Sequence, residues 1–149
     1  MSDVIIRPAK REDMVACSRT LYEWLQATEW MPKLHELDDM IEHGTGWVFD
    51  NRTIFVAEQH GEVVGSIVPS DDNFVTAFYI NEHHRSQGIG SQLMERAQQE
   101  RPAGLTLWTF VANTASHRFY QRHGFAEVER TDGNNEEGLP DIRFAWKSG

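Results

Sequence analysis

The sequence predicts one domain of the α/β (α+β) class over residues 1–149. Short runs rich in β-branched and aromatic residues alternate with segments whose apolar residues recur every three or four positions. Glycine, proline, asparagine and aspartate residues separate these segments. A chain of 149 residues is long enough to bury a proper core. The predicted order is strand, two helices, three strands, helix, strand, helix and two strands.

The first half of the chain should hold two helices and three strands. The expected elements are a strand at Val4–Pro8, helices at 12–28 and 34–43, and strands at 53–58 and 62–68. In the first helix the apolar residues share one side: Met14, Cys17, Leu21, Trp24 and Leu25. Gly44 is expected to end the second helix. His60-Gly61 predicts a hairpin turn between the two later strands.

The second half should hold four strands and two helices. The expected elements are strands at 74–80, 105–111, 126–131 and 142–146, and helices at 90–100 and from 113 to about 123. The loop between the last two strands, 132–141, is polar and contains glycine. No linker, repeat or low-complexity tract interrupts this order.

A glycine-containing turn joins the strand at 74–80 to the next helix and predicts an anion site. The first amides of a helix lack intrahelical acceptors, and glycine lets a bulky anion approach the backbone at Gly88 and Gly90. The chain lacks the Gly-Lys-Ser/Thr of a Walker A loop, and Leu93 stands where a dinucleotide fingerprint needs its third glycine. What remains is Arg/Gln-x-x-Gly-x-Gly/Ala. Taken alone, the turn could also be a helix entry with two incidental glycines.

A second motif follows the next predicted strand. Residues 113–125 match Asn-x-x-Ala/Ser-x-x-Phe-Tyr-x-x-x-Gly-Phe. Asn113 is a candidate N-cap and Gly124 a candidate residue just beyond the helix, which is therefore short. Ser116, Phe119 and Tyr120 lie one turn apart on one helical face.

The two motifs, in this order and about one strand apart, resemble those of the GNAT superfamily of acyl-CoA-dependent N-acyltransferases. The chain resembles a small stand-alone bacterial-type member, from Val4 to Trp146, and most specifically over 75–125. The resemblance implies the GNAT fold, a mixed and strongly twisted central sheet of six to seven strands with about four helices on its two faces. It also implies acetyl-CoA as the acyl-donor cosubstrate, and no metal.

The resemblance assigns cofactor contacts to residues of both motifs. They are Phe78, Tyr79, Ile80, Arg85, Ser86, Gln87, Gly88, Ile89, Gly90, Ser91, Asn113, Ser116, Arg118 and Phe119. Because the chain is acidic, Arg85 and Arg118 are expected to meet the phosphates of the cofactor. Local capping or pairing is the alternative for Arg85, and simple core packing is the alternative for Phe119.

Acetyl transfer to an amine requires a neutral nitrogen, a stabilised oxyanion and a proton for the leaving thiolate. The resemblance places Tyr120 beside the CoA sulfur, as the candidate general acid; a hydroxyl that only hydrogen-bonds the sulfur or packs is the alternative. Backbone amides near residues 78–80 are the expected oxyanion donors, since strands four and five of the GNAT fold splay apart there. The strand at 74–80 carries no carboxylate or histidine, unlike several members of the superfamily. The neighbouring acidic and histidine residues are more typical of solvated loops, so no general base is named: Asp71, Asp72, Glu82 and His83.

The amine acceptor is expected between the first two helices and the last loop. Trp24, Trp30 and His35 are the candidate substrate contacts, because this fold places its substrate lid there. Ordinary core packing is the alternative for the tryptophans. A plain solvated loop is the favoured interpretation of the acidic segment 132–141.

Composition limits the classes of function. The net charge of −9 argues against a nucleic-acid surface. No apolar stretch reaches the ~18 residues of a membrane span, and the N-terminus lacks a signal-peptide pattern. The single cysteine, Cys17, suits a reducing cytoplasm, where we expect the protein. The seven histidines lack metal-ligand spacing, and a homodimer is left open.

The leading hypothesis is an N-acetyltransferase that moves the acetyl group of acetyl-CoA to a primary amine, most simply of a small molecule. A CoA-binding sensor without catalysis is the second class, supported by the missing strand carboxylate and opposed by Tyr120. A protein acetyltransferase acting on N-termini or lysines is the third. The sequence leaves the acceptor, the acyl-chain length and the pathway open.

Overall fold

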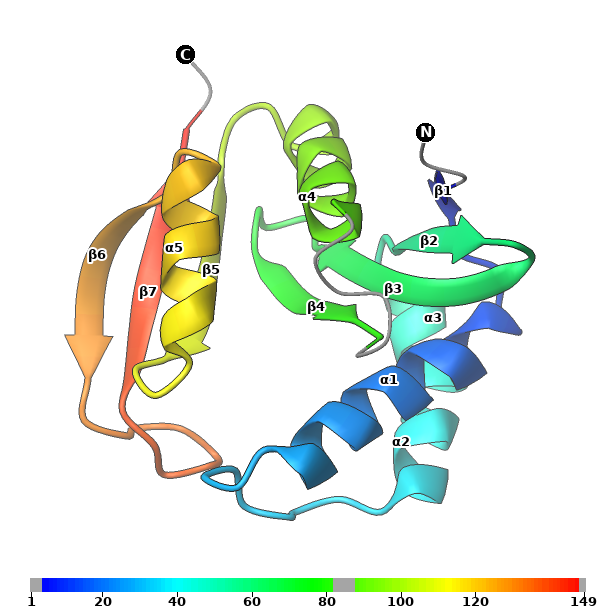
Figure 1. Cartoon of the computed structure of the whole chain (residues 1–149), viewed down its shortest axis with the longest axis horizontal. Helices are drawn as coiled ribbons and strands as arrows, with labels where there is room; N and C mark the ends of the chain where they lie inside the picture. Colours follow the sequence, from blue (N-terminus) through cyan, green and yellow to red (C-terminus); the bar gives the residue numbers. More distant parts are fainter. Residues whose placement is uncertain (1–3, 82–87, 148–149) are drawn as a thin grey trace.

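The computed structural model describes residues 4–81 and 88–147. The described residues form seven strands and five α-helices, with a π-helical stretch between α2 and α3 (Figure 1). The strands are β1 (Val4–Pro8), β2 (Phe55–Gln59), β3 (Glu62–Pro69), β4 (Val75–Ile80), β5 (Leu105–Phe110), β6 (Ala126–Thr131) and β7 (Asp141–Trp146). The helices are α1 (Asp13–Ala27), α2 (Leu37–His43), η1 (Gly44–Val48), α3 (Phe49–Asn51), α4 (Ile89–Glu100) and α5 (Thr114–Arg122). Among the described residues, no helix has the length and apolar character to cross a membrane.

The strands form two antiparallel sheets that meet at one point. One sheet has the order β1-β2-β3-β4 and the other β5-β7-β6. A single parallel bridge, Phe74 to Thr106, connects them where β4 and β5 begin. Figure 1 shows the two strands separating from there toward their C-terminal ends. The mixed α/β fold class predicted from the sequence is confirmed, with seven strands.

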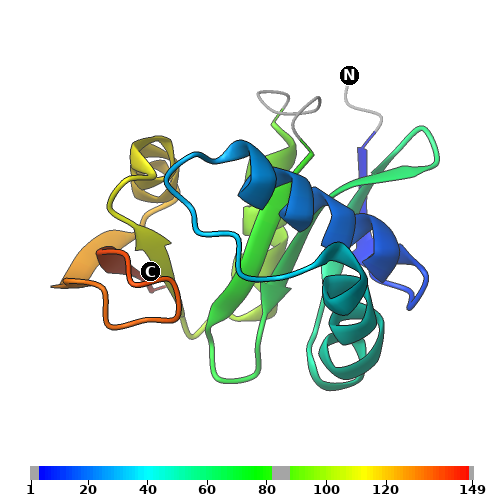
Figure 2. The ribbon, with the colours of Figure 1, turned by 90° about the horizontal axis from the view of Figure 1, so that it is seen from below.

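Helices cover both faces of the four-stranded sheet, and the alternation of side chains along β2 and β3 explains why. Phe55, Ala57 and Ile67 belong to the core cluster that contains Leu93 and other residues of α4. The intervening side chains of these strands pack instead with residues of α1: Val56 and Val68 with Met14 and Cys17. Figure 2 gives a second view of α1 crossing the sheet.

The second helix departs from the prediction at both ends. It begins at Leu37 and not at 34, and it continues past Gly44 through η1 and α3 to Asn51. The expectation that Gly44 ends the helix is wrong, because Gly44 has right-handed helical angles (φ −65°, ψ −45°). A Cβ at Gly44 would lie 2.7 Å from Ser18 Oγ of α1. Gly44 therefore permits close helix packing and does not stop the helix.

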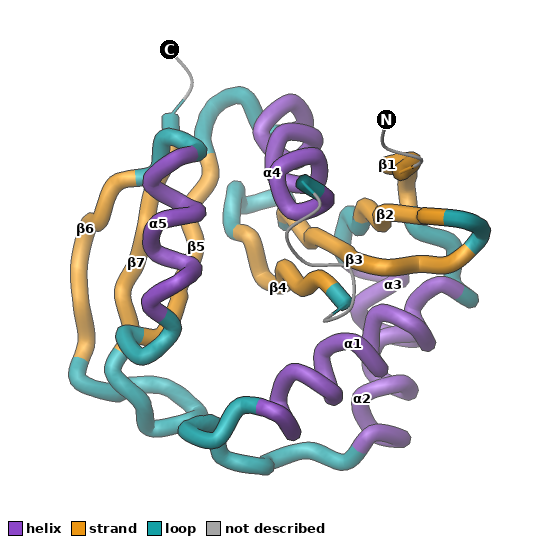
Figure 3. Tube along the Cα trace, in the orientation of Figure 1, coloured by secondary structure: helices purple, strands orange, loops and turns teal. Residues whose placement is uncertain are grey.

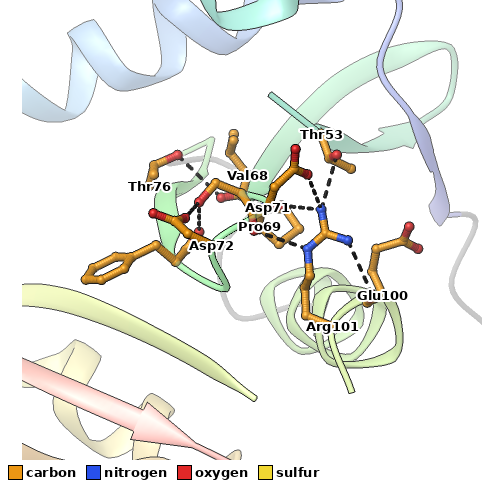
Figure 4. Close-up of polar contacts among 10 residues, drawn as sticks. Thr53, Val68, Pro69, Asp71, Asp72, Thr76, Glu100 and Arg101 are labelled. Atoms are coloured by element: carbon orange, nitrogen blue, oxygen red, sulfur yellow. Dashed lines mark hydrogen bonds and ion pairs between the residues drawn. The ribbon is translucent and has the colours of Figure 1, made fainter. Parts of the chain in front are cut away.

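The turn between β3 and β4 is fastened to the C-terminal end of α4 by Arg101 (Figure 4). The Arg101 guanidinium donates to the carbonyl oxygens of Ser70 (3.1 Å) and Pro69 (3.2 Å), and it pairs with Asp71 (3.1 Å). Asp72 accepts a hydrogen bond from the Ser70 hydroxyl, which lowers the pKa of this carboxyl. These contacts hold the point at which β4 begins, so they set where the two sheets diverge.

Candidate active site

The diverging strands β4 and β5 leave a cleft of about 590 Å³. Residues of α1, β4, β5, α5 and the start of α4 line it. They are Trp24, Val75, Thr76, Ala77, Phe78, Tyr79, Ile80, Gly88, Gly90, Ser91, Leu107, Trp108, Thr109, Phe110, Asn113, Ala115, Ser116, Phe119, Tyr120 and Arg122. The cleft therefore brings together the strand, the glycine turn and the Asn113 motif, which are distant in sequence.

The backbone of β4 offers hydrogen-bond donors to this cleft. The backbone amide of Asn81 donates a hydrogen bond to the Val64 carbonyl (2.7 Å). This bond identifies which opposing residues of the antiparallel β3–β4 ladder form hydrogen-bonded pairs. Hydrogen-bonded and non-bonded pairs alternate along such a ladder. Ile80, opposite Gly65, and Phe78, opposite Ile67, are therefore non-bonded positions. Their N–H groups point away from β3, toward the open edge that faces β5.

Side chains on β4 alternate between the two faces of the sheet. Phe78 turns toward α5, with its ring centroid 5.5 Å from that of Phe119 and 6.4 Å from that of Tyr120. Tyr79 turns toward α1, with its ring 5.7 Å from Trp24. The neighbouring aromatic residues of β4 thus contact opposite walls of the cleft.

The start of α4 has the geometry that the glycine turn predicts. Gly88 precedes the helix with a left-handed backbone (φ 79°), and a Cβ there would meet nothing within 4 Å. A Cβ at Gly90 would lie 3.4 Å from the Phe119 ring, which is an ordinary packing distance, so α4 and α5 are in contact at this position. Ile89 is buried in the core, while Ser91 lines the cleft. The predicted contacts Arg85, Ser86 and Gln87 lie outside the described residues.

Tyr120 on α5 lines the cleft and is nearly buried, with 9% of its surface exposed. Its ring packs among those of Phe119 (5.6 Å), Phe125 (5.8 Å) and Phe144 (5.9 Å). Burial raises the pKa of the phenol above its ordinary value, so the hydroxyl keeps its proton through the physiological range. The group is therefore available as a proton donor and not as a base.

The N-terminal end of α5 is fastened to β5 by hydroxyl groups. Ser116 Oγ donates to the Asn113 carbonyl (2.7 Å) and lies 2.8 Å from Thr109 Oγ1. Asn113 stands at the N-cap position, but its side chain makes no capping hydrogen bond. Gly124 follows the helix with a positive φ (89°), as its motif position predicts. Both Asn113 and Ser116 line the cleft.

Arg122, which the sequence analysis did not select, is the cation of α5 that lines the cleft. Arg118, which it did select, is exposed and outside the described residues that line the cleft. Positions 115, 119 and 122 follow one another at i, i+4 and i+7, so they share a face. The helical spacing around Phe119 could therefore have identified Arg122.

Comparison with known proteins identifies the family to which this chain belongs. Residues 50–127, slightly more than half of the chain, match the acetyltransferase (GNAT) domain. The chain belongs to the GNAT family of acetyltransferases. It is therefore an acyltransferase, as the sequence motifs predict.

Individual relatives cover nearly the whole chain. The peptidyl-lysine N-acetyltransferase YiaC of Escherichia coli is 28% identical over 145 residues, which are 95% of this chain and 96% of YiaC. An N-acetyltransferase structure from Staphylococcus aureus aligns over 98% of this chain and 99% of that chain, with a TM-score of 0.75 and 23% identity. The structure of yncA from Salmonella typhimurium, with its cofactor acetyl-CoA, covers 99% of this chain and 95% of that one, with a TM-score of 0.75 and 17% identity. The two structures show that this chain has the GNAT fold.

A row of four aromatic side chains, each in contact with the next, crosses one end of this GNAT cleft. The Trp24 ring lies 5.7 Å from Tyr79 and 6.0 Å from Trp30, and the Trp30 ring lies 5.7 Å from Phe110. The rings therefore connect β4, α1, the segment after α1 and β5. Burial, with a smaller contribution from the charge of Glu137, raises the pKa of Tyr79 to about 12.

Two loops meet beside these rings, at the bottom of Figure 3. His35 Nε2, in the segment between α1 and α2, lies 3.0 Å from Glu136 Oε1 in the β6–β7 loop. The amide of Asn135 donates to the Leu139 carbonyl (2.7 Å) and to Asp141 Oδ2 (3.0 Å). Side-chain hydrogen bonds within the segment 132–141 thus support its conformation, while alternate residues of the segment are exposed, as expected of a solvated loop.

A smaller pocket of about 220 Å³ adjoins the cleft and shares Trp24 and Ile80 with it. Its other lining residues are Thr20, Glu23, Ala27, Thr28 and Asn81. Glu23 is exposed and is the one charged residue of this lining. The sequence analysis missed Glu23, since an exposed glutamate on an amphipathic helix carries no signal of its own.

The carboxylates that precede β4 do not reach the cleft. Asp71 pairs with Arg101, and Asp72 bonds the Ser70 hydroxyl, both in the turn drawn in Figure 4. Glu82 and His83 lie outside the described residues. Within residues 4–81 and 88–147, no group of three His, Cys, Asp or Glu side chains could hold a metal ion.

Proposed function

We propose that this GNAT protein transfers the acetyl group of acetyl-CoA to the primary amine of a small molecule by direct attack. The observation that carries the proposal is the cleft between β4 and β5, which Tyr120 lines together with β4, an edge strand of its sheet. The yncA structure, which has the same fold, holds acetyl-CoA.

The acyl donor would lie along the open edge of β4, with its diphosphate at the start of α4. The first-turn amides of α4 lack intrahelical acceptors and attract anions. Gly88 leaves open space above this turn, Ser91 adds a hydroxyl, and Arg122 adds a positive charge at the cleft. The Asn113 motif on α5 would form the opposite wall.

The transfer is balanced by one proton from the amine and one from Tyr120. The neutral amine attacks the thioester carbonyl, and the N–H groups of Phe78 and Ile80 stabilise the oxyanion that forms. Collapse of the tetrahedral intermediate breaks the C–S bond, and Tyr120 donates its proton to the leaving thiolate. Burial raises the pKa of Tyr120, but the same apolar wall disfavours a free thiolate and so makes the sulfur a better proton acceptor. Water takes the proton that the amine loses and returns one to Tyr120.

The acceptor would enter at the aromatic end of the cleft, where Trp24, Trp30 and His35 were predicted to contact it. The rings and the His35–Glu136 pair narrow this end, which favours a small amine. Aromatic faces beside carboxylates suit a molecule with ammonium character. Glu23, in the adjoining pocket, would add to this preference.

Acetylation of protein lysines is the second candidate. YiaC, similar along nearly its whole length, is a peptidyl-lysine N-acetyltransferase. A lysine side chain is itself a narrow, cationic amine, so it could pass the same rings.

The test is CoA release from acetyl-CoA, measured with a panel of small primary amines and of lysine-containing peptides. A small amine with kcat/KM at least tenfold above that of every peptide supports the proposal, and the reverse order supports lysine acetylation. Binding of acetyl-CoA without CoA release for any acceptor would favour a sensor that lost its chemistry.

A further inference from the structure

His123 lies at the seam between α4 and α5, directly after the last residue of α5. Its Nε2 atom is 3.0 Å from Ser91 Oγ. Its ring centroid is 4.5 Å from that of Phe119, and its carbonyl accepts a hydrogen bond from Gln98 Nε2 at 2.9 Å. His123 therefore joins the two helices whose facing sides form walls of the cleft.

Ser91 connects this imidazole to the cleft. It is the third residue of α4, directly after Ile89 and Gly90, and it lines the cleft. In the proposed function, the diphosphate of the acyl donor lies at this first turn. The Ser91 hydroxyl would then lie between His123 and the anion, so His123 would not contact the anion directly.

We propose that His123 is a positioning residue for the diphosphate: its Nε2–H donates to Ser91 Oγ and thereby turns the Ser91 hydroxyl proton toward the anion. This inference rests on the proposed function. A neutral imidazole has one donor and one acceptor nitrogen. If Nε2 were the acceptor, the Ser91 proton would point at His123 and the oxygen lone pairs would face the anion. An anion at this site therefore selects the states in which Nε2 carries hydrogen.

The charges around His123 couple this choice to pH. Burial, and secondarily the charge of Arg122, lowers the pKa of His123 in the free protein, while Glu95 of α4 acts in the opposite direction. A bound diphosphate adds negative charge and raises the pKa. Binding then takes up protons, so affinity is highest below the pKa of the free protein and falls as pH rises through the pKa of the complex.

Calorimetric titration of the full chain with dephospho-CoA tests the proposal. This ligand keeps the diphosphate but lacks the 3′-phosphate of the ribose, a monoester that would itself titrate near pH ~6. Two buffers with different ionisation enthalpies at each pH between 6 and 8 give the number of protons taken up. We expect uptake by the wild type and its loss in His123→Gln, with a Kd at pH 6 raised roughly tenfold, as for a hydrogen bond to a charged group.

Two further variants separate positioning from packing. Ser91→Ala should raise the Kd at pH 6 by the same factor as His123→Gln, and the double variant should bind no more weakly than either single one, because the two groups act in series. His43 of α2 is exposed, and its ring stacks on that of Trp47. The control variant His43→Gln should take up as many protons on binding as the wild type. Equal proton uptake by wild type and His123→Gln, or the same loss of affinity at every pH, would overturn the inference. Failure of the wild type to bind dephospho-CoA or acetyl-CoA would instead overturn the proposed function.

Discussion

Replacing Tyr120 with phenylalanine removes the proposed acid and keeps the ring. The ring packs among those of Phe119, Phe125 and Phe144 at centroid distances of 5.6 to 5.9 Å, contacts that phenylalanine preserves. Loss of one hydroxyl should change the free energy of unfolding by no more than about 1 kcal/mol. Affinity for acetyl-CoA should stay close to that of the wild type.

The chemical step should slow by ~10² or more, the usual contribution of a general acid. That factor corresponds to about 2.7 kcal/mol of lost transition-state stabilisation. Because the raised pKa keeps Tyr120 protonated, deprotonation of this group should cause no fall in wild-type activity below pH ~10. Activity should instead rise with pH as more of the acceptor amine becomes neutral.

Rapid-quench measurement of a single turnover isolates chemistry from product release. The same measurement with an acetyl thioester of a more acidic thiol supplies the control, because a better leaving group needs less protonation. The Tyr120→Phe deficit should shrink with this donor. A single-turnover rate of Tyr120→Phe within a few-fold of wild type would refute the assignment of Tyr120 as the acid. A loss of rate that is the same for both thiol leaving groups would refute it as well.

Three other predictions concern the walls of the cleft. Gly88→Val should raise the KM for acetyl-CoA in steady-state assays, because a β-branched residue is strained at φ 79° and fills the open space above the turn; an unchanged KM would argue against a diphosphate there. Arg122→Ala should raise the same KM several-fold, whereas Arg118→Ala, its matched control outside the cleft lining, should leave it unchanged; the opposite ranking would restore the assignment made from sequence. Arg101→Ala should lower the free energy of unfolding in urea by about 2 kcal/mol, because the carbonyls of the β3–β4 turn lose their donor; Asp71→Asn should change it little, since Asp71 is 92% exposed, and equal losses would contradict this account.

The donor side of the cleft was predictable because its signals are local in sequence. A positive φ at Gly88 and at Gly124, and a short helix between Asn113 and Gly124, follow from the residue types at those positions. The alternation along β4 then places Phe78 and Tyr79 on opposite faces without further information. Each of these features depends on a few consecutive residues.

Gly44 shows where local reasoning fails. A glycine after a helical segment commonly ends the helix by adopting a left-handed backbone, and tertiary contacts decide whether it does so. Here the approach of Ser18 on α1, 26 positions earlier in the numbering, favours a residue without a side chain inside a continuing helix. Gly44 does have a structural role, but that role is to allow close packing of two helices and not to end a helix.

The resemblance named Trp24, Trp30 and His35 for the acceptor end, but the contacts that these residues make could not be predicted, for the same reason, and this has a functional consequence. Its rings and charges come from α1, the following segment, β4, β5 and the β6–β7 loop, and only the folded chain places Trp30 against Phe110 or His35 against Glu136. In the proposed function the donor side would recognise a CoA moiety, which is the same for any acyl-CoA, so a short motif would suffice to describe it. The acceptor would differ among acetyltransferases, and here it would meet side chains from segments that carry no such motif. We therefore expect the choice between a small amine and a lysine side chain to depend on the contacts that narrow this end. Substitutions at Trp30 or His35 should change the ranking of acceptors by kcat/KM and leave the KM for acetyl-CoA unchanged. A KM for acetyl-CoA that moved together with the acceptor ranking would mean that the two ends of the cleft are not separable in this way.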